Sequence, residues 1–161
     1  MAAKLPVDEL VERLDAQYDG LVKRPGYGEL ALFYNPLGLL PAGLYFASFK
    51  TQDGPHDRAS LLDREGVFRL AFGVSLSTFE SLFGTRPARP GRGQVVLMDT
   101  DFSALDTLAP HPVYAWMGWV QVLSPTEPTW SRITPLLAEA HQRATSGYEK
   151  RMNRSLSTPR K

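Results

Sequence analysis

The sequence contains no cysteine. This absence excludes disulfide bonds, cysteine-ligated zinc sites, iron–sulfur clusters and thiol nucleophiles within the chain. A chain without cysteine is suited to a reducing compartment. The composition therefore agrees with a cytoplasmic protein that folds by burying apolar side chains rather than by forming covalent cross-links.

Long apolar runs are also missing. The most apolar stretch, residues 112–123, is too short to cross a bilayer as a helix. The first ten residues become charged before the apolar core of a signal peptide could form. We therefore expect a soluble cytoplasmic protein with no secretory signal and no membrane contact.

The chain lacks a strong net charge. Its 18 basic and 17 acidic residues give a net charge of +1, so no global field attracts nucleic acid or an anionic membrane. Five of the basic residues lie from position 150 onward, after the last acidic residue. The body before them has 13 basic and 17 acidic residues, a net charge of −4, which does not favour sequence-independent DNA binding by the folded part.

With 161 residues, the chain has the size of one domain with a substantial core. We expect a single α+β domain over residues 1–152. Residues 153–161 are polar, basic and without periodicity, which predicts a disordered tail.

Apolar periodicity predicts helices and strands in mixed order. Amphipathic helices are expected over residues 6–21 and 128–148, with a short helix over 77–83. Strands are expected over residues 30–34, 44–50, 67–72, 94–98 and 113–123. This order predicts an α+β fold, in which a single-layer antiparallel sheet of about five strands has helices packed against one face.

The longest predicted strand contains two tryptophans and a glycine. Trp116 and Trp119 would face opposite sides of it, so they could not form one aromatic stack. Gly118, between them, predicts a bulge or a position that another group approaches closely.

The stretch over residues 56–73 is the richest in chemistry-bearing side chains. Its first half holds seven groups that titrate or hydrogen-bond, and its second half reads as a buried strand. A polar cluster that leads into a strand is held by a rigid element. On this strand Arg69 lies opposite the apolar face and needs a partner, for which Asp57 and Asp63 are the candidates.

Two sequence blocks resemble an uncharacterised bacterial family, a domain of unknown function. The first block is Asp-Arg-x-Ser-x-Leu-Asp-Arg at residues 57–64, followed by Phe-Arg-Leu and Ser-Leu-Phe-Gly. The second is Asp-Phe-x-Ala-Leu-Asp at residues 101–106, leading to His-Pro-Val-Tyr-x-Trp-Met. The resemblance covers roughly residues 33–144 and implies no activity. In element order alone the chain is similar to the YjbR-like fold, some members of which are presumed to bind DNA.

These blocks hold the candidate site for a small polar or anionic ligand, or for a protein partner. Arginines offer bidentate donors, and a histidine exchanges a proton near neutral pH. The candidate residues are His56, Asp57, Arg58, Ser60, Asp63, Arg64, Arg69, Asp106, His111 and Trp116. The competing interpretation is that the charged side chains pair with one another and pin a loop onto the sheet.

We place a non-enzymatic ligand- or partner-binding module first. It requires that the charged run before residue 67 folds over the sheet beside residues 106–111 and leaves an accessible hollow. Two alternatives stay open. One is nucleic-acid binding through a basic loop and the tail, with Arg86, Arg89, Arg92, Lys150, Arg151 and Arg154. The other is a small hydrolase-like enzyme with His56 or His111 as base, although no Gly-x-Ser-x-Gly motif is present.

A metal site has weaker support. Asp99, Asp101, Asp106 and His111 carry groups that bind divalent cations, but their spacing matches no metal-binding motif such as HExxH. Aspartates in loops more often cap turns. We therefore predict no metal and no cofactor.

Overall fold

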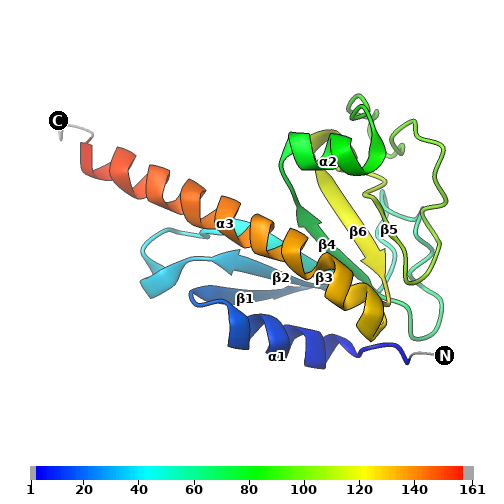
Figure 1. Cartoon of the computed structure of the whole chain (residues 1–161), viewed down its shortest axis with the longest axis horizontal. Coiled ribbons are helices and arrows are strands. Elements are labelled where there is room, and N and C mark those ends of the chain that lie inside the picture. Colours follow the sequence, from blue (N-terminus) through cyan, green and yellow to red (C-terminus); the bar gives the residue numbers. More distant parts are fainter. Residues whose placement is uncertain (1–2, 158–161) are drawn as a thin grey trace.

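A computed structural model describes residues 3–157 of the chain (Figure 1). The chain begins with a helix, forms most of a sheet, and ends with a long helix. The elements in chain order are α1 (Val7–Gln17), β1 (Leu21–Gly26), β2 (Glu29–Tyr34), the short 3-10 helix η1 (Pro36–Gly38), β3 (Leu44–Lys50), β4 (Arg69–Gly73), α2 (Leu76–Phe83), β5 (Leu108–Pro110), the 3-10 helix η2 (Ala115–Met117), β6 (Trp119–Leu123) and α3 (Glu127–Ser157).

The strands form one sheet in the order β1-β2-β3-β4-β6-β5, and each neighbouring pair is antiparallel. The predicted α+β class and antiparallel sheet are confirmed, with six strands rather than about five. β3 and β4 lie inside the sheet, as expected for strands that are covered on both faces.

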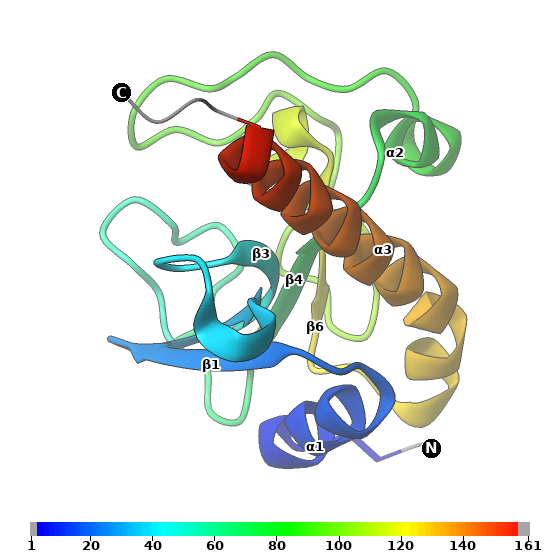
Figure 2. The same ribbon diagram turned by 90° about the vertical axis from the view of Figure 1, so that its left-hand side faces the viewer.

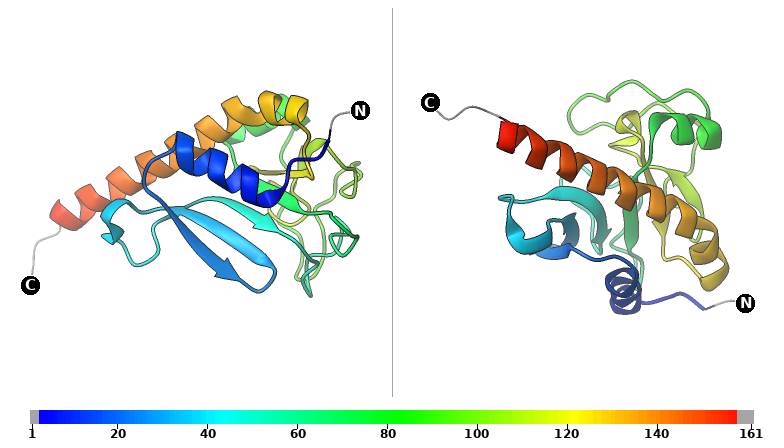
Figure 3. Two further views of the ribbon diagram at one scale, coloured as in Figure 1. Left: turned by 90° about the horizontal axis from the view of Figure 1, so that it is seen from below. Right: turned by 60° about the vertical axis from the view of Figure 1, so that its left-hand side comes forward.

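Helices α1 and α3 cover one face of this sheet, as predicted. Figure 3 shows both helices on the same side of the strands, and Figure 2 shows α3 crossing the sheet while α1 lies beside β1. The core between the layers joins Leu10 and Leu14 of α1, Phe72 of β4, and Ile133 and Leu137 of α3. Burying each such side chain contributes about 1.5–3 kcal/mol to folding.

The other face of the sheet carries polar side chains at its centre. Lys50 of β3 lies directly opposite Arg69 of β4, and Ser48 lies opposite Ala71, which in turn lies opposite Gln121 of β6. Because side chains alternate along a strand, these residues point away from the helix-covered core. The polar face is the floor of the site described below.

β3 and β4 pair over only part of their length. Their register runs from Ala47 opposite Phe72 to Lys50 opposite Arg69. Phe46 is an extra residue in the register between β2 and β3, which is a bulge. The start of β3 therefore pairs with β2 and not with β4. Beside the end of β4, Trp119 of β6 contacts Tyr45 of β3, and Gly147 of α3 lies close to Leu44.

The first predicted helix is too long. It ends at Gln17, and residues 21–26, interpreted from the sequence as the helix end and a turn, form β1. β1 tolerates Pro25 because it is an edge strand of the sheet. Apolar spacing does not separate a last helical turn from an edge strand whose outer positions are charged.

Two of the predicted strands are wrong in whole or in part. Residues 94–98 form no strand, although the N–H of Val96 donates to the Pro112 carbonyl at 2.8 Å. In residues 113–123, η2 and the left-handed Gly118 precede β6, so Trp116 and Trp119 lie on different elements. β5 lies where the sequence predicts no strand.

α3 is longer than predicted. It begins at Glu127, continues through Pro135 and ends at Ser157, so residues 153–157 of the predicted tail are helical. The rest of the predicted tail, residues 158–161, lies outside the described residues. No helix within residues 3–157 is long and apolar enough to span a membrane.

Gly118 is a position of close approach, as the sequence predicts. Its φ is +87°, and a Cβ there would lie 2.7 Å from the backbone oxygen of Val74. Gly118→Ala is therefore expected to lower the free energy of unfolding by about 1–2 kcal/mol. Urea denaturation measures this change. Gly66→Ala is the control, because Gly66 also has a positive φ but no atom within 4 Å of its Cβ position; equal losses in the two variants would contradict a role for the contact with Val74.

Candidate functional site

An ion cluster lies at the centre of the polar face. Arg69 of β4 donates two parallel hydrogen bonds to Asp57, one from Nη1 to Oδ1 at 2.9 Å and one from Nη2 to Oδ2. Lys50 Nζ, from the neighbouring strand, lies 3.1 Å from the same Oδ2. Of the two partners that the sequence offers to Arg69, Asp57 is the one that pairs with it.

The cluster is largely withdrawn from solvent. The Arg69 side chain is 4% exposed, and those of Asp57 and Lys50 are each 15% exposed. Burial alone would raise the pKa of Asp57, but the hydrogen bonds and charge of Arg69, together with the charge of Lys50, hold this pKa well below its usual range. Asp57 is thus ionised and balances one of two cations, which leaves one positive charge in excess.

His111 is buried beside this cluster in its neutral form. Its Nδ1 accepts hydrogen bonds from the N–H groups of Val113 and Tyr114, at 3.0 and 3.1 Å. These two bonds place the ring proton on Nε2. Burial lowers the pKa of His111 well below its ordinary value, and the positive charge of Arg69 lowers it further. His111 can therefore donate through Nε2 but has no free lone pair with which to act as a base.

A cavity of about 860 Å³ opens over the cluster. Its floor includes Ser48, Lys50 and Arg69 of the sheet, with Asp57 and His111 from the adjoining loops. Its far end lies where β3 parts from β4, and side chains of α3 close it there. The residues that line this far end are Phe33, Leu44, Tyr45, Gly73, Trp119, Ala140, Arg143, Ala144 and Arg151.

Four of the ten residues predicted for the ligand site meet at this cavity, namely His56, Asp57, Arg69 and His111, and Arg151 of the nucleic-acid alternative lines it too. A fifth, Ser60, is buried under the cluster: its Oγ donates to Gln121 Oε1 at 2.9 Å, and Arg69 Nη1 lies 3.5 Å from it. The start of the charged run, at His56 and Asp57, therefore lies beside His111 with an open hollow next to it, whereas the rest of the run does not line this cavity. That arrangement is the spatial requirement of the binding hypothesis.

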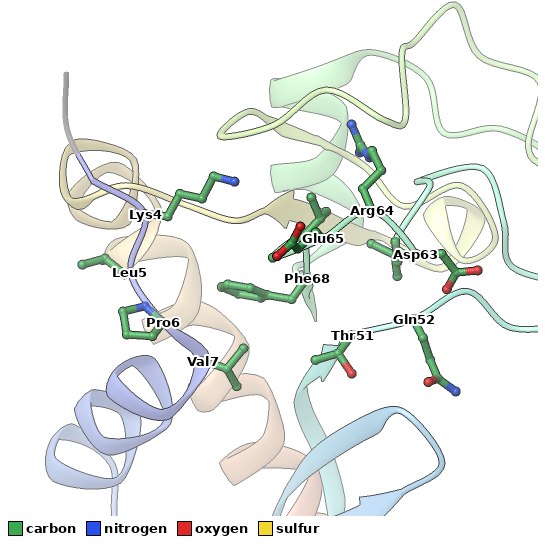
Figure 4. Close-up of a pocket in the computed structure, with 13 residues that line it drawn as sticks. Lys4, Leu5, Pro6, Val7, Thr51, Gln52, Asp63, Arg64, Glu65 and Phe68 are labelled. Atoms are coloured by element: carbon green, nitrogen blue, oxygen red, sulfur yellow. The ribbon is translucent and has the colours of Figure 1, made fainter.

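Other members of the predicted cluster point elsewhere and hold loops. Arg64 Nη2 donates to the carbonyls of Ser60 and Ser103, at 3.0 and 2.9 Å, and Asp63 Oδ1 accepts from the N–H of Asp53. Asp63 and Arg64 line a second cavity of about 810 Å³, across from Lys4 and its neighbours (Figure 4). Arg58 is exposed and lines neither cavity. Asp63 and Arg64 therefore hold loops, as the competing interpretation expects, but they do so through backbone groups and not by pairing with each other.

Asp106 and Trp116 do not face the larger cavity. Asp106 accepts hydrogen bonds from the N–H and hydroxyl of Thr126, just before α3. Trp116 lies in η2 with the guanidinium of Arg89 4.9 Å from its ring centroid, and Arg86 Nη1 lies 3.4 Å from its carbonyl oxygen. Asp106 thus stabilises the start of α3, and Trp116 holds the loop that carries Arg86 and Arg89.

Asp101, one of the acidic residues weighed as metal ligands, serves a local turn. Asp101 accepts hydrogen bonds from the N–H and hydroxyl of Ser103, at 2.9 and 2.6 Å, which lower its pKa. Within residues 3–157, no group of three or more histidine, aspartate or glutamate side chains is placed to hold a metal ion.

Sequence reasoning missed several residues of the cavity, above all Lys50 and Tyr45 of β3. The hydroxyl of Tyr45 lies 3.0 Å from Glu29 Oε1, and partial burial of this half-exposed side chain raises the pKa of Tyr45 to about 12. The available signal was the strand over residues 44–50, which ends in a lysine and whose alternation puts polar residues on one face. That signal does not identify which distant loop the lysine meets.

A comparison with protein-family models gives a match over most of the chain. A family model described as "Family of unknown function (DUF6194)" matches residues 5–153. The matched residues include the ion cluster of Lys50, Asp57 and Arg69, and the match confirms the resemblance to a domain of unknown function. The similarity to the YjbR-like fold stays a prediction. No curated protein and no solved structure matches the chain.

Proposed function

Because the chain belongs to DUF6194, a family of unknown function, we propose its role from the cavity itself: the domain is a non-enzymatic binding module for a small organic anion. The carrying observation is the excess positive charge of the buried cluster of Lys50, Asp57 and Arg69. A charge that is partly removed from water is costly unless an opposite charge meets it. A bound anion would supply that charge.

The surroundings of the cluster support an anion. The cations that line the cavity are Lys50, Arg69, Arg143 and Arg151, whereas its carboxylates are Glu29 and Asp57. The cavity is thus positive, and three of its four cations, Lys50, Arg69 and Arg143, belong to the body before residue 150, which has a net charge of −4. Such a local reversal attracts small anions more than it attracts the extended phosphate backbone of a nucleic acid.

Hydrogen-bond donors remain for the ligand. The contact of Lys50 with Asp57 uses one of three N–H groups on the ammonium. The neutral ring of His111 carries its proton on Nε2, and His111 lines the same cavity. A ligand acceptor that meets these donors adds affinity.

The two alternatives have less support. In the hydrolase hypothesis, His111 would act as a base, but its Nδ1 lone pair already accepts two backbone N–H groups. In the nucleic-acid hypothesis, the loop arginines would be available, but Arg86 and Arg89 contact Trp116 within the protein.

Isothermal titration calorimetry tests the proposal with four anions: succinate, ribose 5-phosphate, 6-phenylhexanoate and 6-cyclohexylhexanoate. At least one should bind, and its uncharged amide or dephosphorylated form should bind at least tenfold more weakly, which is about 1.4 kcal/mol. Lys50→Met should weaken the anion by a similar factor. Lys23→Met is the matched control, because Lys23 pairs with Asp15 outside the cavity.

If none of the four anions binds, or if the neutral forms bind as tightly as the charged ones, the domain is not a binding module for small organic anions. The comparison of charged and neutral forms uses the unaltered protein, so it decides the question even if Lys50→Met does not fold.

A further inference from the structure

We infer that the ligand carries a planar aromatic ring, joined by a spacer to the anionic group, and that this ring binds at the far end of the cavity, in the corner formed by the Tyr45 and Trp119 rings. This inference rests on the proposed function, since it takes the cluster as the place of the anion. It adds the chemical class of the ligand and its direction in the cavity.

Exposed apolar side chains gather at this cavity. Tyr45 is 41% exposed, Tyr114 is 48% exposed and Met117 is 45% exposed, and all three line it. Single exposed apolar residues are common on protein surfaces, but a group that converges on one concave site indicates an apolar partner. A simple inorganic anion would leave these side chains without a function.

The aromatic rings form a corner. The Tyr45 and Trp119 rings meet edge to face, with centroids 5.0 Å apart and an interplanar angle of 89°. Beneath the indole lies Gly73, where a Cβ would come within 2.9 Å of Trp119 Nε1. The indole therefore lies directly on the β4 backbone. A flat ring placed in this corner would stack on one aromatic wall and meet the other with its edge, the two geometries that aromatic pairs prefer.

The spacing between the two ends of the cavity requires a spacer. Gly73, under the indole, and Arg69, in the cluster, are four residues apart on β4. A strand rises about 3.3 Å per residue, so the two positions are about 13 Å apart along the strand. Long side chains of the cluster shorten this gap, but a ring that carries its acid directly would not contact both ends.

Two classes of ligand share this chemistry, aromatic acids with an alkyl spacer and mononucleotides. The carboxylate arm of the test compares 6-phenylhexanoate with 6-cyclohexylhexanoate by calorimetry, and the phosphate arm compares AMP with ribose 5-phosphate. The saturated ring is the more hydrophobic of the first pair, so a cavity that only excludes water would prefer it. We expect the member with the aromatic ring to bind about threefold to tenfold more tightly than the other member in at least one pair. The pair with the larger ratio of affinities identifies the class of ligand, aromatic acid or mononucleotide.

Variants of Tyr45 test where the ring binds. Tyr45→Leu should bring the ratio within the preferred pair close to one, whereas Tyr45→Phe, which keeps the ring and loses the hydroxyl bonded to Glu29, should retain it. Tyr27→Leu is the matched control, since Tyr27 is almost fully exposed in the turn between β1 and β2.

The outcomes separate this inference from the proposed function. Equal affinity within both pairs, or a ratio that survives Tyr45→Leu, overturns the aromatic site while anion binding stands. If no anion binds, both fall. If Tyr45→Leu does not fold, the ratios measured on the unaltered protein decide whether the ring is recognised.

Discussion

Asp57→Ala is expected to lower the free energy of unfolding by about 3–5 kcal/mol, because it removes one partner of a buried ion pair and leaves the other charged and unpaired. Arg69 is 4% exposed and donates both terminal nitrogens to Asp57, and Lys50 approaches the same carboxylate. Guanidinium denaturation at neutral pH measures the loss.

Two further variants show whether the loss comes from the cluster. Glu65→Ala removes an exposed carboxylate from the same loop and should change stability by no more than about 0.5 kcal/mol. The double variant Asp57→Ala/Arg69→Met should be more stable than Asp57→Ala alone, because the unpaired guanidinium is gone. A small loss for Asp57→Ala, or a double variant that is less stable still, would contradict a buried, mutually dependent pair.

The free energy of unfolding should also fall in mildly acidic solution because of His111. Burial lowers the pKa of this histidine well below its ordinary value, with Arg69 and Lys50 acting in the same direction and Asp57 against them. The folded protein keeps His111 neutral, whereas the unfolded chain binds a proton below about pH 6.5. Protonation therefore favours unfolding. Stability is complete above that pH and falls by about 1.4 kcal/mol for each pH unit below it, until the folded pKa is reached.

Denaturation curves at pH 8, 6.5, 5.5 and 4.5 measure this slope, and His111→Gln should flatten it. His141→Gln is the comparison variant, because burial also lowers the pKa of His141, although Asp19 opposes the shift. Asp57 contributes in a separate window: its lowered pKa stabilises the folded state above about pH 4, and that contribution is lost as the pH falls below this value. An unchanged slope between pH 6.5 and 5 in His111→Gln would contradict the buried neutral histidine.

The sequence predicted much of the fold because the relevant signals are local. Apolar residues on both faces of the strand over residues 44–50 indicated a central, covered strand, and β3 lies inside the sheet over those same residues. Where local signals compete, the prediction was wrong. The charged residues of β1 were interpreted as a helix end, and residues 113–123 were predicted as one strand, whereas Gly118 separates η2 from β6.

The candidate site was predicted in composition but not in arrangement. His56, Asp57, Arg69 and His111 were selected for their chemistry and line one cavity. Arg64 and Asp106 were selected on the same grounds but bond to backbone groups outside this cavity, at Ser103 and Thr126. Residue type and spacing do not distinguish these cases, because both kinds of side chain are polar and, apart from Arg69, lie in loops.

The amino-acid order by itself determined the α+β class, the alternation that separates an apolar face from a polar one, and the need of Arg69 for a buried carboxylate. These properties depend on neighbours a few residues apart. Only the tertiary structure decided that Lys50 pairs with Asp57, that Tyr45 contacts Trp119, and that one cavity extends from the first pair to the second. Such contacts join residues far apart in the chain, and their geometry follows from strand register, from the bulge in β3 and from the path of α3, which no local pattern specifies.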